Sequence, residues 1–94
     1  MNLNQAKQIL KEINTASNDF LKNELLELAV EYARIRTDFY FMDDEEMRSR
    51  DITRSLKHNA LIDACNILAR DMNSKGESTN WREKLTNDRK IIGD

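Results

Sequence analysis

Residues 43–73 read DDEEMRSRDITRSLKHNALIDACNILARDMN and contain neither proline nor glycine. The two residues that most disfavour helix interiors are therefore absent. The run opens with four acids, which stabilise the positive end of a helix dipole. It predicts one helix of about 45 Å, crowded with charge in its first half and apolar in its second.

The preceding segment, residues 18–41, carries a heptad pattern. Its apolar positions follow each other at steps of four and three, which is typical of long helices packed side by side. They are Leu21, Leu25, Leu28, Tyr32, Ile35, Phe39 and, just beyond, Met42. We expect the chain to reverse near Met42–Asp44, with Asp43 or Asp44 as helix N-cap, so that the two long helices form an antiparallel hairpin.

Two shorter helices are expected to flank this hairpin. Apolar residues at Leu3, Ala6, Leu10 and Ile13, with Ile9 beside them, predict a helix over 3–15. Ser17 or Asn18 can cap the helix that follows, and Gly76 is a stop signal for the long one. Trp81, Leu85 and Ile92 predict the buried face of a last helix over 79–92. The prediction is an all-α fold: an antiparallel bundle of four helices, about 3–15, 18–41, 44–73 and 79–92, in a single domain over 1–94.

Size and composition restrict the class of protein. The chain has 94 residues and a net charge of −2, so it supports one domain and gives no overall electrostatic case for binding nucleic acid or an anionic membrane. A single cysteine excludes an internal disulfide framework. No membrane-spanning run and no signal peptide are recognisable, which predicts a cytoplasmic location. The adjacent Ile91 and Ile92 predict that the end docks on the bundle or that the chain continues beyond residue 94.

Charges on the two long helices indicate a register. If positions whose numbers sum to about 85 lie opposite each other, Arg34 meets Asp51, Glu31 meets Arg54 and Glu27 meets His58. These opposite-sign pairs favour one orientation of the hairpin. With two nearby arginines they define a candidate polar interaction site: Glu27, Glu31, Arg34, Arg48, Arg50, Asp51, Arg54 and His58.

Motifs for catalysis are missing from the sequence. No Glu-x-x-His pair accompanies the single histidine, His58, and no glycine-rich phosphate loop is present. Cys65 lies in an apolar run and is expected to be an inert core thiol. The prediction is therefore a protein that is not an enzyme, with no cofactor and no metal site. A metal-dependent helical enzyme centred on His58 remains an alternative.

A second alternative is a small nucleic-acid-associated regulator. Arg48, Arg50, Arg54 and Lys57 share the first half of the long helix and could contact phosphates. Interleaved acids such as Asp51 weaken this basic patch. Nucleic acid is therefore possible as a partner but not favoured.

The leading hypothesis comes from a second apolar line on the long helix. Ile52, Leu56, Ala60, Ala64 and Ile67 lie on a face that adjoins the heptad seam. We expect the first helix to cover part of the long helix, and the tail helix or a second copy of the chain to cover more. This favours a non-enzymatic protein-interaction or regulatory module that associates with itself or with another protein.

The second half of the chain resembles known sequences. The run His58–Leu68, followed by Trp81-Arg82-Glu83 and by Asp88–Asp94, is similar to small uncharacterised proteins of Gram-positive bacteria and their mobile elements. The resemblance implies a bacterial cytosolic setting and brings no assigned activity.

Overall fold

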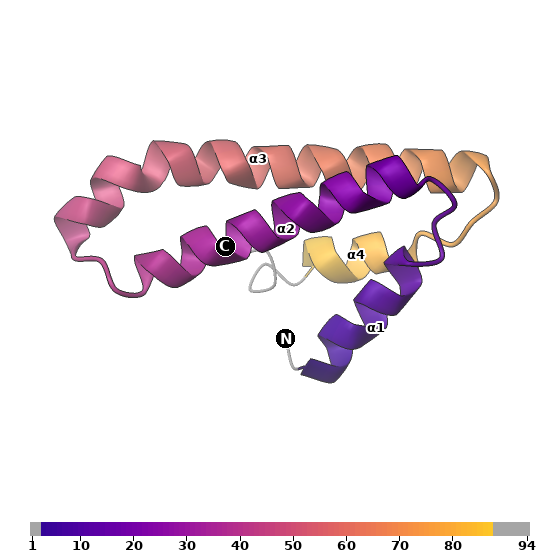
Figure 1. Cartoon of the computed structure of the whole chain (residues 1–94), viewed down its shortest axis with the longest axis horizontal. Coiled ribbons are helices and arrows are strands. Elements are labelled where there is room, and N and C mark those ends of the chain that lie inside the picture. Colours follow the sequence, from indigo (N-terminus) through magenta and orange to yellow (C-terminus); the bar gives the residue numbers. More distant parts are fainter. Residues whose placement is uncertain (1–2, 88–94) are drawn as a thin grey trace.

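The computed structural model describes residues 3–87, and this part of the chain contains helices and no strand. The helices are α1 (Leu3–Ile13), α2 (Asp19–Phe39), α3 (Asp44–Ser74) and α4 (Asn80–Asn87). Figure 1 shows α2 and α3 running side by side in opposite directions, with α1 and α4 grouped at the end away from the α2–α3 turn. The all-α prediction is confirmed. The last helix begins at Asn80, one residue after the expected start, and its expected C-terminal end with Ile92 lies outside the described residues.

Local signals place the helix ends. The Asn18 side chain accepts a hydrogen bond from the Leu21 amide at 3.1 Å, and Asp43 accepts one from Glu46 at 2.8 Å. Both residues therefore act as N-caps, at the positions where the sequence offers them. At the end of α3, Gly76 has a φ of 75° and its amide donates to the Asn73 carbonyl at 3.1 Å.

The end of α3 is a Schellman motif. The amide of Glu77, two residues past the C-cap Lys75, donates to the Met72 carbonyl at 2.9 Å, and the residue just before Glu77, Gly76, has the left-handed conformation. A residue with a Cβ would be strained at this φ, so the predicted glycine stop is confirmed with its physical reason.

The heptad seam of α2 faces α3 as expected. Leu25 and Tyr32 are buried, and the other five seam residues are half-buried. On α3 the matching positions of the second half are all buried: Leu61, Cys65, Leu68 and Met72. The apolar period therefore identified the faces along which the two long helices pack.

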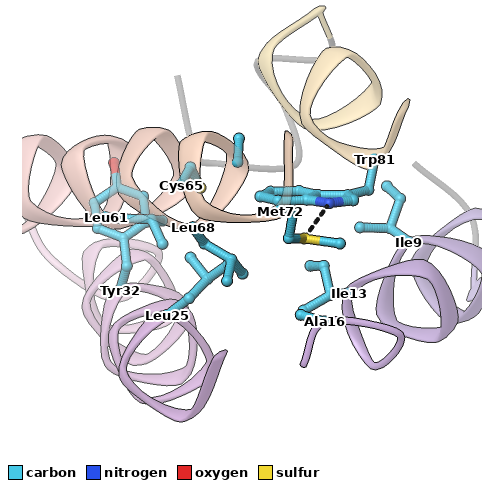
Figure 2. Packing of buried hydrophobic residues seen from close by; sticks show 11 residues of the cluster. Ile9, Ile13, Ala16, Leu25, Tyr32, Leu61, Cys65, Leu68, Met72 and Trp81 are labelled. Carbon is cyan, nitrogen blue, oxygen red and sulfur yellow. Dashed lines mark hydrogen bonds between the residues drawn. The ribbon is translucent and has the colours of Figure 1, made fainter. Parts of the chain in front are cut away.

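The hydrophobic core lies at one end of this hairpin. Trp81 of α4 is fully buried, and its indole Nε1 donates to the Met72 sulfur at 3.3 Å. Figure 2 shows this pair between α3 and the Ile9–Ile13 face of α1. We call this region, which holds every buried residue of the described chain, the cored end.

The rest of the hairpin has no such core. Between Tyr32 and Leu61, in residues 33–60, no residue is buried. We call these residues the distal hairpin. All four helices contribute to the core only at the cored end, because α1 and α4 are too short to extend along the distal hairpin.

On α1 the buried face differs from the expected one. Ile9 and Ile13 are buried together with Ala16, whereas Leu10 is 46% exposed. The sequence placed Leu10 on the apolar face because it lies three residues before Ile13. In the structure Ile9 and Ile13, which are four residues apart, are the α1 side chains that face Trp81 and Met72 (Figure 2).

Candidate interaction surface

The predicted polar site centres on Arg54, which is held from two helices. Its Nε donates to Asp51 Oδ1 at 2.9 Å, one turn earlier on α3, and its Nη1 donates to the Tyr32 hydroxyl on α2 at 3.2 Å. A further bond runs from its Nη2 to Ser55 Oγ at 3.1 Å. The hydrogen bond to Asp51 is the main reason that the pKa of Arg54 is raised above its ordinary value. This arginine is thus a bridge between the helices.

His58 belongs to the same cluster. Its ring packs on Tyr32 with centroids 5.4 Å apart and planes tilted by 51°. Tyr32 is buried and His58 half-buried. The contact places His58 at the border between the cored end and the distal hairpin, in an aromatic setting.

One cross-helix ion pair lies about one turn from the pairing expected from charge. Glu31 pairs with Lys57 at 2.6 Å, and Arg54, the partner expected for Glu31, donates to the hydroxyl of the neighbouring Tyr32 at 3.2 Å. Lys57 lies three residues further along α3, close to one helical turn. The reason is that the buried side chains Leu25, Tyr32, Leu61 and Cys65 determine how the helices meet, while half-exposed charges adjust by rotamer. The pairs expected from charge did not include this contact between Lys57 and Glu31.

The basic patch of the nucleic-acid alternative is divided by these contacts. Arg54 and Lys57 each engage an acid of the same chain. Arg48 and Arg50 are exposed, as are the predicted site residues Glu27 and Arg34. Within residues 3–87 there is also no group of three His, Cys, Asp or Glu side chains suited to a metal ion. The structure thus does not gather the predicted polar residues into one chemical centre.

An apolar stripe on α3 is the more distinctive surface. Ile52 is 75% exposed and Leu56 65% exposed, and Ile67 further along is also exposed. With the half-buried Ala60 they follow one face of the helix, on the line that the sequence had indicated. No described helix covers Ile52 or Leu56. We call Ile52, Leu56, Ala60 and Ile67 the α3 stripe.

The turn between α2 and α3 forms a second unusual surface. Tyr40 and Phe41 are 90% and 86% exposed. From residue 38 to residue 46 all charged side chains are acids: Asp38, Asp43, Asp44, Glu45 and Glu46. Both rings lie in solvent and neither belongs to the hydrophobic core. We call residues 38–46 the acidic tip.

A shallow depression of about 440 Å³ lies at the opposite end, between α3 and α4. Two arginines and no acid are among the residues that line it: Asn66, Ala69, Arg70, Asn73, Thr79 and Arg82. The Arg82 guanidinium is oriented by Asn66, whose Oδ1 accepts from Nε at 2.9 Å and from Nη2 as well. We call it the Arg70–Arg82 depression, and sequence reasoning had only noted Arg82 as part of a resemblance.

Hydrogen bonds and an ion pair of charged side chains also join neighbouring loops and helices at the cored end. The Glu77 carboxylate accepts from both the amide and the hydroxyl of Ser17, each at 3.1 Å, so the loop before α2 is tied to the loop after α3. Lys84 of α4 meets Glu12 of α1 at 2.8 Å. These contacts stabilise the short helices and leave the α3 stripe uncovered.

Burial explains the state of Cys65. The thiol is 1% exposed, and desolvation raises its pKa to about 11 although Arg82 opposes the shift. It is therefore protonated at neutral pH, a poor state for a nucleophile.

Three comparisons with known proteins identified no protein similar to this chain. A scan against protein-family models, a search of curated proteins and a search of solved structures each returned no match. None of the helices in residues 3–87 is long and apolar enough to cross a membrane.

Proposed function

We propose that this chain is a non-enzymatic helical interaction module that self-associates through the α3 stripe, in a bacterial cytoplasmic setting. The observation that carries the proposal is the exposure of Ile52 and Leu56 on the distal hairpin, where residues 3–87 supply no cover. Exposed apolar side chains that line up on one face are typical of a contact surface.

Burial of this stripe supplies a driving force. Fully burying one Leu or Ile side chain contributes about 1.5–3 kcal/mol. A second copy of the chain would bury the stripe of both molecules at once, because a two-fold contact uses the same patch twice. Association also costs translational and rotational freedom, so a contact of two helices gives a concentration-dependent dimer rather than a permanent one.

The polar chemistry of the chain supports a binding role over a catalytic one. The cross-helix polar residues are used to join α2 to α3, as in the Arg54–Tyr32 and Glu31–Lys57 contacts. The thiol of Cys65 is buried and protonated at neutral pH. These residues therefore serve the packing of α2 and α3 and are not placed as a nucleophile or general base.

Solution mass as a function of concentration tests the proposal. We expect the wild-type chain to shift from the mass of one 11.0 kDa chain towards twice that mass as concentration rises in sedimentation equilibrium. Leu56→Glu should abolish the shift, because it places a charge in the apolar contact. Val30→Glu is the matched control, since Val30 is an exposed apolar residue on α2 outside the stripe. A single-chain mass at millimolar concentration would overturn the proposal.

A further inference from the structure

We infer that two copies pair antiparallel through α3, across a two-fold axis at Leu56, and that each acidic tip then lies at the Arg70–Arg82 depression of the other copy. The inference rests on the proposed self-association and adds its geometry. It uses three surfaces that the fold leaves unexplained: the α3 stripe, the acidic tip and the depression.

The face around Leu56 has a symmetric arrangement. At 3.6 residues per turn, positions four and seven residues away in either direction return to the same side of the helix, within about 40°. These positions are Ile52 and Ala60, then Ser49 and Asp63. Apolar residues thus lie next to the centre, and polar residues lie on both sides of them, as expected for a two-fold contact with an apolar core and a polar rim.

Antiparallel pairing about Leu56 brings matching groups together. Leu56 meets Leu56 of the second copy, and Ile52 meets the small Ala60 of the second copy. Asp63 then lies between Ser49 and Arg48 of the second copy, and the two-fold axis repeats this contact at the other end. Both Arg48 and Asp63 are exposed and therefore available for an intermolecular ion pair.

A parallel arrangement is disfavoured by the same charges. With α3 in register and parallel, Asp63 would face Asp63 and Arg48 would face Arg48, which places like charges together. The pattern of charge therefore selects the antiparallel orientation.

The same register relates the two ends of the hairpin. When Leu56 lies on the axis, Asp44 at the start of α3 is level with Leu68 of the second copy, and the acidic tip lies at that end of the helix. The Arg70–Arg82 depression is at that level. An acidic tip with two exposed aromatic rings is complementary to a concave surface that has two arginines and no acid.

Cysteine pairs test the register directly. Ser49→Cys and Asp63→Cys proteins should form an oxidised disulfide dimer when mixed, because positions 49 and 63 of different copies face each other. Each variant alone should form far less, since its own two thiols would be about 20 Å apart along the axis. Leu56→Cys alone should cross-link with itself, and the buried native Cys65 should not react.

The tip contact is tested by substitutions that change the dimer dissociation constant. Arg70→Glu and Phe41→Ser should each weaken dimerisation about tenfold. Lys7→Glu and Phe20→Ser are matched controls, because both residues are exposed and neither belongs to α3, the acidic tip or the depression. We expect the controls to leave the dissociation constant within about twofold.

The outcomes separate the two proposals. A dimer whose Ser49→Cys and Asp63→Cys mixture does not cross-link, or cross-links no better than each variant alone, overturns the register and leaves self-association standing. A dimer that cross-links but is insensitive to Arg70→Glu and Phe41→Ser overturns the tip contact. A chain that remains monomeric overturns both.

Discussion

The cored end and the distal hairpin are made of the same two helices, yet they are stabilised differently. At the cored end, buried side chains of all four helices form one cluster, which includes Trp81 of α4 and Met72 of α3. Along the distal hairpin, α2 and α3 are the only helices of residues 3–87 that pack together, and the contacts at its border include Arg54–Tyr32 and Glu31–Lys57. The comparison shows that two packed helices alone cannot shield all their apolar residues from water. Ile52 and Leu56 therefore remain exposed.

This contrast predicts a large difference between two leucines of α3. Leu68→Ala should lower the free energy of unfolding by about 2–5 kcal/mol, because it opens a cavity at a fully buried position. Leu56→Ala should change it by less than about 0.5 kcal/mol in the monomer. Urea unfolding at a concentration below dimerisation measures both. Equal losses would show that the two regions are not distinct in packing.

The pKa of the Cys65 thiol measures how well water is excluded from the cored end. Its pKa in the folded chain is about 11, above its ordinary value of 9.0. Between these values the unfolded chain loses the proton and the folded chain keeps it, so stability should fall as pH rises from about 9 to 11. The expected slope is at most about 1.4 kcal/mol per pH unit.

The control for this prediction is Cys65→Ala. Its stability differs from that of the wild type by a constant below pH 8, and the difference should shrink towards pH 11 as the wild type loses the contribution of its buried thiol. A difference that stays constant through pH 11 would mean that the site is open to water.

A smaller effect compares the caps at the two ends of the hairpin. Asn18→Ala removes the cap of α2 at the cored end, and we expect a loss of about 1 kcal/mol in global stability. Asp43→Ala removes the cap of α3 at the tip, where opening is local. Its main effect should be faster amide hydrogen exchange over residues 44–50, with little change in the unfolding midpoint. Slower exchange at the tip than at the cored end would contradict the contrast.

Sequence reasoning performed best on features that depend on neighbouring residues. Interactions within one helical turn determine the caps Asn18 and Asp43 and the stop at Gly76, so the local sequence was enough to predict them. The α2 seam was also predictable, because its period of three and four repeats over the length of the helix.

Features that depend on distant residues were less predictable. The partner of Glu31 is Lys57 because buried leucines and Tyr32 determine the helix contact. The choice of Ile9 over Leu10 follows from the position of Trp81, far away in the chain. The Arg70–Arg82 depression also joins residues of two helices, and no local pattern marks it.

The sequence by itself determined that the chain is mainly helical, where α2 and α3 begin, where α3 ends, and which faces of the long helices are apolar. These properties follow from hydrogen bonds and periodicity within single segments. The tertiary structure alone decided which apolar faces are covered. Coverage depends on the length and position of α1 and α4, which shield the cored end and leave Ile52 and Leu56 exposed to a partner.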